Sequence, residues 1–337
     1  MNKSTISDVA READVSKSTV SRVINDVPNV DPELRERVLV AIDKLDYQPS
    51  RAARTLKKDL KDVVGFLVPS ISDTIFGDVM QGAEDYAYEK QMGILPYSTA
   101  DDLERQQRYL DGFLAERVAG LVVVPAPQTD PQVLHTIQAQ GIPIVLLDRK
   151  LTGFEADYIG SDNIQGAHDA VTHLIEEGYT RIATIAGSQQ VSTGVDRLTG
   201  YRTAMAEHNL TIQPDWIQFG NFNKQDSYQA FQNLLQLDKI PEAIFIANDA
   251  MTISVLRAVR DLGICIPDDL AIAGFDELLI ADLLTPALTT IEQAAESLGQ
   301  EALQLLFDRI QYPNRPTRIV QIPTKINIRE SSLSKSS

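Results

Sequence analysis

Polar side chains suited to hydrogen bonding a hydroxylated ligand recur where short apolar stretches end. Asp148 and Arg149 follow one such stretch, Asn248 and Asp249 follow another, and Asp276 follows a third. Carboxylates accept hydrogen bonds from hydroxyls, whereas guanidinium and amide groups donate to ring oxygens. A single Asp in such a place is more often a helix N-cap, so the set as a whole carries the argument. The set predicts a site for a small neutral polyol such as a sugar.

The elements that must position these side chains form a regular series. Short β-branched stretches alternate with helix-length segments, at residues 63–69, 94–98, 120–125, 143–148, 158–161, 181–187, 242–247 and 270–276. This rhythm is typical of βαβ units, whose parallel strands deliver their carboxyl ends to one edge of a sheet. The series divides into two similar groups, the second opening at Ile164. We therefore expect an α/β body of two doubly wound parallel-sheet subdomains with a ligand cleft between them.

The first 48 residues predict short helices instead of strands. Thr5 to Asp8 fits a capping box, Ser16 is a suitable cap for a second helix, and Asp31-Pro32 is a start signal for a third. The second helix turns Val20, Val23 and Ile24 inward and leaves a small, polar, basic face outward. Two short helices joined by a tight turn favour a helix-turn-helix, whose outward Lys17, Ser18 and Arg22 would read a major groove. A generic three-helix bundle with a solvated polar face is the alternative.

The detailed string of residues 5–25, TISDVAREADVSKSTVSRVIN, closely resembles the DNA-binding signature of the LacI/GalR family of bacterial transcription regulators. It departs at Asp14, where the family usually has Gly, although Asp tolerates the left-handed conformation better than most residues. The resemblance implies operator contacts by Thr5, Ser16, Lys17, Ser18, Thr19, Ser21, Arg22 and Asn25.

Residues 49–61 are short, rich in Ala and Arg, and net positive. They lack the apolar density to hold a helix without partners. The segment resembles the family's hinge helix, which orders on DNA and pairs with that of its dimer mate in the minor groove. The resemblance implies that Leu56 wedges into a base step and that Arg51, Arg54 and Lys57 contact the DNA. A flexible basic linker is the alternative.

Residues 62–330 resemble the periplasmic sugar-binding fold that the family uses as its effector-binding and dimerising core. The matching motifs are LDR at 147–149, SDN at 161–163, RLTGY at 197–201, ND at 248–249 and GFD at 274–276. The resemblance is closest to ribose-binding members, although Asp73 replaces the usual Asn and Ile75 the usual Phe. It implies a sugar site formed by Asp73, Ile75, Phe76, Asp148, Arg149, Thr193, Arg197, Phe222, Asn248, Asp276 and Gln293.

The same resemblance implies the domain bounds. We expect a helix-turn-helix head at 1–48, a hinge at 49–61, an N-subdomain at about 62–160 and 293–322, and a C-subdomain at about 163–290. Residues 331–337 are expected to be a disordered tail.

Charge is distributed unevenly along the 337 residues, whose net charge is −16. Residues 1–61 hold 12 Lys and Arg against 10 Asp and Glu, whereas the remaining residues hold 19 against 37. The acidic body repels phosphate, so any contact with nucleic acid falls to the head. No membrane-length apolar stretch and no secretory signal are seen, and a single Cys265, expected to be a buried thiol, fits a reducing cytoplasm.

Enzyme motifs are absent from the sequence. It contains no P-loop, no G-x-G-x-x-G turn, no H-E-x-x-H and no G-x-S-x-G elbow. We therefore expect no enzymatic activity, no cofactor and no metal.

The favoured hypothesis is a cytoplasmic repressor, homodimeric on a pseudo-palindromic operator and switched by ribose or a related pentose, with no membrane partner. The alternatives are a periplasmic-type sugar transport protein, a sugar-acting enzyme using Asp148 and Asp276, and a family regulator that answers to a purine or a protein corepressor. Val191 stands where a purine-responsive member has a base-contacting Arg, which disfavours the purine.

Overall fold

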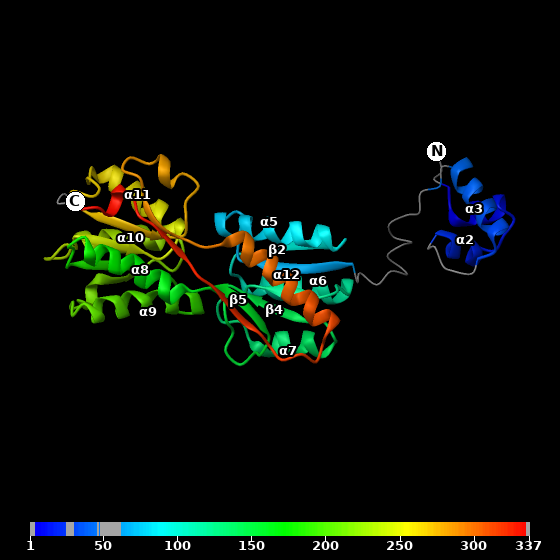
Figure 1. Ribbon diagram of the computed structural model, residues 1–337, viewed down its shortest axis with the longest axis horizontal. Helices are drawn as coiled ribbons and strands as arrows, with labels where there is room; N and C mark the ends of the chain where they lie inside the picture. Colours follow the sequence, from blue (N-terminus) through cyan, green and yellow to red (C-terminus); the bar gives the residue numbers. More distant parts are fainter. Residues whose placement is uncertain (1–3, 25–29, 46, 48–61, 335–337) are drawn as a thin grey trace. The chain divides into compact units, whose positions relative to one another are not determined.

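The computed structural model describes residues 4–24, 30–45, 47 and 62–334. The chain divides into two compact units, Met1–Leu60 and Lys61–Ser337, here called the head and the body (Figure 1). The expected hinge, with Arg51, Arg54, Leu56 and Lys57, lies outside the described residues, as does Asn25.

The head contains three helices in its described part, α1 (Ile6–Glu12), α2 (Lys17–Ile24) and α3 (Pro32–Lys44). Local side chains define where they begin. The Asp8 carboxylate accepts from the Thr5 amide at 2.9 Å, the Ser16 hydroxyl accepts from the Thr19 amide at 3.1 Å, and Asp31 accepts from the amides of two residues at the start of α3. The predicted helix starts are confirmed.

Apolar residues from all three helices form the core of the head. Val9, Val20 and Val38 are fully buried there. In the turn between α1 and α2, Asp14 has φ 49°, which is the left-handed conformation. This is the position where the family usually has Gly, and Asp adopts the conformation that Gly would adopt more easily. Arg37 of α3 donates to the carbonyl oxygens of Ala13 and Asp14, at 2.6 and 3.0 Å, and so ties this turn to the third helix.

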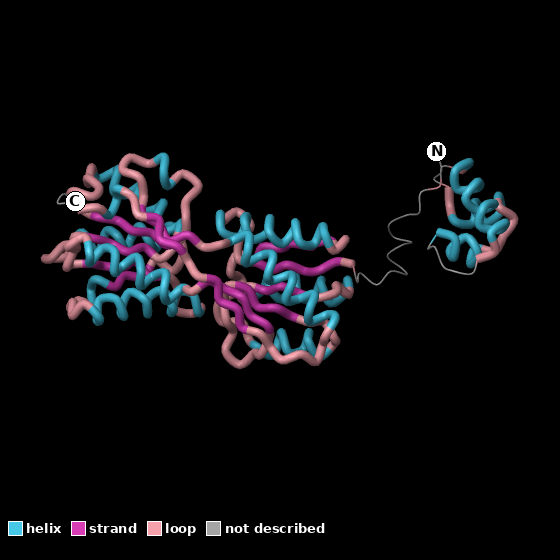
Figure 2. The backbone as a smooth tube through the Cα atoms, viewed as in Figure 1, coloured by secondary structure: helices cyan, strands magenta, loops and turns pink. Residues whose placement is uncertain are grey.

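The body contains two six-stranded sheets, as predicted for its fold class. The first has the strand order β11-β5-β4-β3-β1-β2 and is parallel throughout. Figure 2 shows helices on both of its faces. Its elements are β1 (Val63–Val68), β2 (Gly93–Ser98), β3 (Leu121–Val123), β4 (Ile144–Leu147), β5 (Asp157–Ser161) and β11 (Ile319–Ile322), with α5 (Thr74–Glu89), α6 (Leu103–Glu116), α7 (Pro131–Ala139) and α12 (Ala295–Gln311).

The second sheet has the order β12-β10-β9-β8-β6-β7 and is parallel except for β12, which runs antiparallel to β10. Apolar clusters fill both of its faces. Its elements are β6 (Ile182–Ala186), β7 (Ile217–Phe219), β8 (Ala243–Ile246), β9 (Ala271–Phe275), β10 (Thr289–Glu292) and β12 (Lys325–Asn327), with α8 (Asn163–Glu176), α9 (Ser192–Glu207), α10 (Lys224–Leu235), α11 (Asp249–Leu262) and the short turns η1 (Pro214–Trp216), η2 (Ala281–Leu283) and η3 (Glu330–Ser332).

Helices α5 and α12 pack with their backbones in close approach (Figure 1). A Cβ on Gly82 would lie 1.9 Å from the carbonyl oxygen of Glu296, and one on Gly299 would lie 1.8 Å from that of Val79. Only glycine permits this spacing. Because Asp73 precedes α5 and Gln293 lies just before α12, the packing holds these two predicted ligand-binding residues in register.

The C-terminal segment differs from its prediction. Residues 331–334 are ordered, so the expected disordered tail from residue 331 is wrong for this part. Ser331 and Ser332 of η3 are buried; the Ser331 hydroxyl donates to the Ile272 carbonyl at 2.7 Å, and that of Ser332 lies 2.7 Å from His173 Nε2. The chain therefore returns to the second sheet after β11, where polar partners distant in sequence anchor it.

Candidate functional site

The outward face of α2 carries the predicted DNA-contacting residues. Lys17, Ser18 and Arg22 are exposed, and Thr19 and Ser21 are partly exposed. Ser16 caps the helix, and Thr5 is held at the start of α1 by Asp8. Since Val20 and Val23 are buried in the core of the head, the polar and basic side chains of α2 lie on its outward face.

The carboxyl ends of strands from both subdomains meet at one cavity of about 80 Å³. The parallel strands bring these ends together, as the sequence predicted. The cavity is lined by all eleven predicted effector residues, namely Asp73, Ile75, Phe76, Asp148, Arg149, Thr193, Arg197, Phe222, Asn248, Asp276 and Gln293. Their role in binding a ligand stays a prediction.

Three further residues, Pro69, Asp101 and Asp249, line the cavity and are absent from the predicted set. Asp249 had a signal in the sequence, because it directly follows Asn248 at a strand end. Asp101 had a weaker one, since it comes three residues after β2 in a loop. Asp101 contacts Arg149, which is 48 positions away in the sequence, and this long-range contact makes it part of the site.

That contact is an ion pair between the buried Arg149 and the partly exposed Asp101. Arg149 donates to both carboxylate oxygens of Asp101, at 2.6 and 3.1 Å, and also to the Pro125 carbonyl at 3.1 Å. Its Nε has no hydrogen-bond partner and lies 4.0 Å from Asp148. A bidentate pair fixes the plane of a guanidinium, so Arg149 presents its remaining donor in a set direction.

Arg197 is held by the second subdomain. Its Nε donates to Asn163 at 2.7 Å, and its Nη1 donates to the Ala247 carbonyl at 2.6 Å and lies 3.6 Å from Asp276. The guanidinium carbon lies 3.7 Å from the centre of the Phe275 ring. These contacts fix the orientation of the Arg197 guanidinium beside the cavity.

Asp276 and Gln293 form a further buried pair at the passage between the subdomains. The Gln293 amide donates to Asp276 at 2.5 Å, whereas its Oε1 has no hydrogen-bond partner although the residue is only 8% exposed. A buried polar atom without a partner costs free energy. Two atoms of residues that line the cavity, Gln293 Oε1 and Arg149 Nε, thus have no hydrogen-bond partner within the protein.

Several cavity residues have a backbone conformation that side chains rarely adopt. Asp101, Asp148, Phe222 and Asp276 have φ between 57° and 74°. Non-glycine residues in this region cost about 1–3 kcal/mol each and are concentrated at functional sites. The backbone conformation of these four cavity residues therefore lowers the stability of the folded protein.

Burial raises the pKa of three cavity carboxyls. The pKa values of Asp73 and Asp148 are raised, and that of Asp249 is raised to about 6, with the neighbouring Asp276 adding repulsion. In each case desolvation is the largest cause, because it disfavours the charged form.

We expect Asp249→Asn to stabilise the protein at neutral pH. A raised pKa means that the native state loses stability as the pH rises from about 4 through about 6. Asparagine keeps the acceptor for the Ala250 amide and removes the charge. Thermal unfolding should show a melting temperature about 2–6 °C higher than the parent's at pH 7.5 and little difference at pH 4. If the melting temperatures of variant and parent differed equally at both pH values, the raised pKa of Asp249 would be contradicted.

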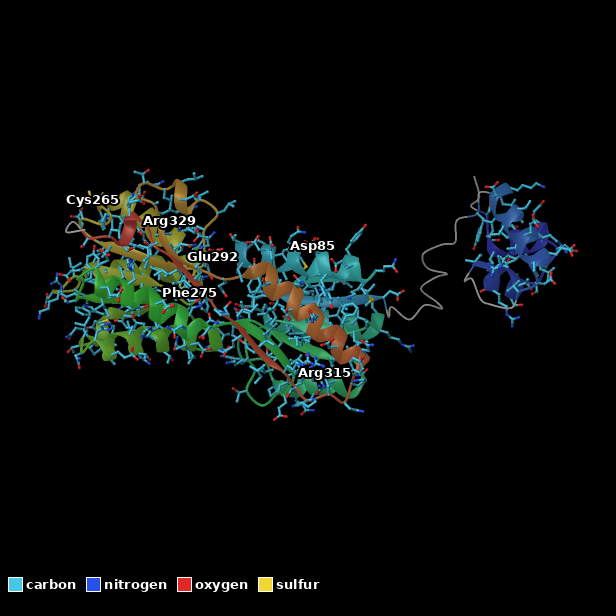
Figure 3. The ribbon with its side chains drawn as sticks, in the orientation of Figure 1. Asp85, Cys265, Phe275, Glu292, Arg315 and Arg329 are labelled. Carbon is cyan, nitrogen blue, oxygen red and sulfur yellow. The ribbon has the colours of Figure 1, made fainter. Side chains whose placement is uncertain are left out.

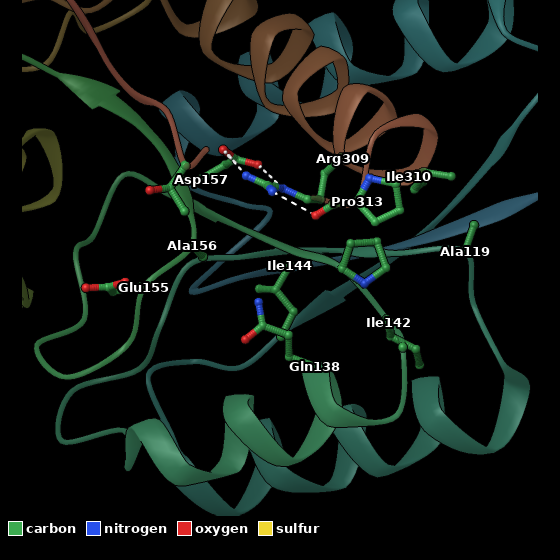
Figure 4. A pocket seen from close by; sticks show the side chains of 13 residues that line it. Ala119, Gln138, Ile142, Ile144, Glu155, Ala156, Asp157, Arg309, Ile310 and Pro313 are labelled. Carbon is green, nitrogen blue, oxygen red and sulfur yellow. Dashed lines mark hydrogen bonds and ion pairs between the residues drawn. The ribbon is translucent and has the colours of Figure 1, made fainter. Parts of the chain in front are cut away.

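A larger cavity, of about 340 Å³, lies at the opposite end of the first sheet, where β4 and β5 begin (Figure 4). Its ion pair is fully used within the protein: Arg309 donates to both oxygens of Asp157 and to three backbone carbonyls, including that of Pro313. This cavity therefore offers a ligand no free buried charge.

Other candidate chemistry is limited in the described part of the chain. Cys265 is exposed after α11, so the expectation of a buried thiol is wrong (Figure 3). Among the described residues no group of three or more His, Cys, Asp or Glu side chains is arranged to hold a metal ion. No helix in this part of the chain has the length and apolar character needed to cross a membrane.

Known proteins resemble both parts of the chain. A model of "Bacterial regulatory proteins, lacI family" matches residues 5–50, and one of a "Periplasmic binding protein-like domain" matches residues 171–332. The HTH-type transcriptional repressor PurR of Histophilus somni (strain 129Pt) is 34% identical over 327 residues, which cover 97% of this chain and 98% of that protein. The chain belongs to the lacI family of bacterial regulatory proteins. It is a DNA-binding transcriptional repressor, and like the other members of this family it is not an enzyme.

Solved structures agree with this LacI-family assignment. The transcriptional regulator CelR in complex with cellobiose is 30% identical, with a TM-score of 0.74 over 98% of this chain and 100% of that chain. The lac repressor dimer bound to operator and the anti-inducer ONPF is 26% identical, with a TM-score of 0.82 over 99% of this chain and 100% of that chain.

Proposed function

We propose that this LacI-family repressor controls a sugar-utilisation operon and that ribose or a related pentose, bound in the 80 Å³ cavity, relieves repression. The observation that carries the proposal is the set of hydrogen-bonding groups left open there. Gln293 Oε1 and Arg149 Nε are buried without partners among strand-end carboxylates and amides. A polyol supplies both donors and acceptors from each hydroxyl and so satisfies both atoms.

The ligand would be bound by both subdomains at once. Asp148 and Arg149 belong to the first, whereas Arg197, Asn248 and Asp276 belong to the second. Such a ligand favours the closed form of the cleft, and its differential affinity for the closed and open forms sets the coupling, typically about 1–3 kcal/mol. Closure is then the change that lowers operator affinity.

Operator binding is assigned to the outward face of α2, with Lys17, Ser18 and Arg22 as its exposed polar centre. One helix-turn-helix offers few base contacts, so two heads on a pseudo-palindromic site are needed. We assign the protein to the cytoplasm, where such an operator lies, and to a homodimer.

The dimer surface is assigned to exposed apolar residues in η2 and just before it. Leu279 and Leu283 are 85% and 75% exposed, and Ile280 between them is half exposed. Isolated exposed apolar residues are ordinary, but a contiguous group of large ones marks an interface. The related lac repressor is itself described as a dimer.

We expect the double variant Leu279→Asp/Leu283→Asp to shift the protein to monomers. Two carboxylates placed at an apolar interface are desolvated without partners, which opposes association. Sedimentation velocity measures the change, and operator affinity should fall with it because the two heads become independent. Exposed Leu262→Asp, on α11, is the matched control. If the double variant remained dimeric, the dimer interface would not include Leu279 and Leu283.

Calorimetry of the full-length protein with ribose, ribose 5-phosphate, fructose and adenine tests the effector, with operator release as the functional readout. We expect ribose to bind and to release the operator. Binding of none of these ligands would point to another ligand or to a protein corepressor.

A purine is the second candidate, because the relatives in sequence include repressors named PurR. Val191, however, is buried as the N-cap of α9 and is not among the residues that line the cavity. Binding of adenine alone would establish the purine and overturn the sugar.

A further inference from the structure

The cavity carries more negative than positive charge. Five carboxylates line it against two guanidinium groups: Asp73, Asp101, Asp148, Asp249 and Asp276 against Arg149 and Arg197. Lys224 also acts on Asp73, but it is exposed, and solvent screens its charge. The cavity therefore holds three more acidic than basic groups where water is partly excluded.

Both arginines are already engaged within the protein. Arg149 is neutralised by its bidentate pair with Asp101. Arg197 donates to Asn163 and to the Ala247 carbonyl and lies beside Asp276. An anionic ligand would thus meet cations whose charge is compensated and carboxylates whose charge is not, which disfavours a sugar phosphate.

Asp73 is the carboxylate best placed to receive a ligand cation. It is the N-cap of α5, yet its side chain makes no capping hydrogen bond with the helix and is hydrogen-bonded by Ser70 instead. It lines the cavity at the first-subdomain wall, where Asp101 and Asp276 add negative potential. The unpartnered Oε1 of Gln293 also lines this cavity and needs a donor.

We propose that the effector is a pentose-sized polyol that carries a protonated amine. This inference rests on the proposed function and narrows its ligand class. An ammonium group supplies three donors and one positive charge, so it satisfies Gln293 Oε1 and compensates Asp73 when the cleft closes. A neutral sugar supplies hydroxyl donors and acceptors but no positive charge, so closure over it leaves the excess acidic groups without a counter-charge.

Proton exchange gives the two ligand classes opposite signatures. Burial raises the pKa of Asp73, Asp148 and Asp249, while Arg149, Arg197 and Lys224 are the cations that face them. A bound ammonium favours the ionised carboxylates and so releases protons. A neutral ligand desolvates the same groups further, so its binding takes up protons. At about pH 6 a sugar amine is itself fully protonated and adds nothing to the balance.

Calorimetry of the full-length protein with matched sugars tests the proposal. The probes are D-ribose, 2-amino-2-deoxy-D-ribose and its N-acetyl derivative, titrated in two buffers of different ionisation enthalpy. We expect the amine to bind about tenfold or more tightly than ribose, with proton release, and the neutral N-acetyl derivative to lose that advantage.

Single substitutions test which carboxyl group is responsible for the preference for the amine. Asp73→Asn keeps size and capping ability and should abolish most of the preference for the amine, with Asp249→Asn as the second variant. Asp85→Asn, an exposed carboxylate on the same helix, should retain the full preference. Ribose binding as tightly as the amine would overturn this inference and leave the proposed function standing. Failure of every amine to bind would also overturn it, and operator release by ribose would then decide the proposed function separately.

Discussion

Asp276→Asn is expected to leave operator binding intact and to weaken effector binding by about 10- to 100-fold. The residue is buried at the passage between the subdomains, where it accepts from Gln293 at 2.5 Å and lies 3.6 Å from Arg197. Asparagine keeps an acceptor for Gln293, but it loses the charge that strengthens hydrogen bonds from a ligand. Calorimetry measures the affinity, and release of labelled operator measures the response.

Asp85→Asn serves as the control for this variant, because it removes an equal charge from an exposed position on α5. It should bind effector and release operator as the parent does. If Asp276→Asn kept the parent's effector affinity, the 80 Å³ cavity would not be the effector site.

Arg22→Ala is expected to cost about 1–3 kcal/mol of operator affinity and to relax discrimination between operator and unrelated DNA. Arg22 is exposed on the outward face of α2, and a guanidinium in a major groove reads guanine by two hydrogen bonds. Binding to a set of single-base operator variants measures the discrimination.

Arg11→Ala is its matched control, since it removes the same charge from α1, where the side chain is 77% exposed and pairs with Asp8. It should change affinity for all sequences alike. If the two variants lost discrimination equally, α2 would not be the recognition helix.

Local sequence was sufficient for the helix starts of the head and for most of the buried strands of the body. Ser16 and Asp31 cap helices through contacts with residues two or three positions away, so their effect is visible in a short window. Buried parallel strands appear as β-branched stretches, because both of their faces are covered. Four strands were not predicted, although the edge strand β2 was. β7 and β12 have three residues each, β11 alternates exposed and half-buried residues, and the buried β10 has the sequence Thr-Thr-Ile-Glu. Such strands lack an unbroken apolar signature.

The sequence by itself determined which polar residues stand at strand ends, and parallel pairing then brings those ends together. The resemblance of residues 62–330 to the family's sugar-binding core supplied the set of eleven predicted residues that line the cavity. Tertiary structure alone decided which groups the charged side chains of the cavity contact. Asp101 neutralises Arg149 across 48 positions, and Ser331 is anchored by Ile272 across 59. Contacts of that separation depend on how loops and chain ends meet in space, so no local pattern encodes them. The pairing of Arg149 with Asp101, and the absence of a partner for Gln293 Oε1, depend on contacts of this kind.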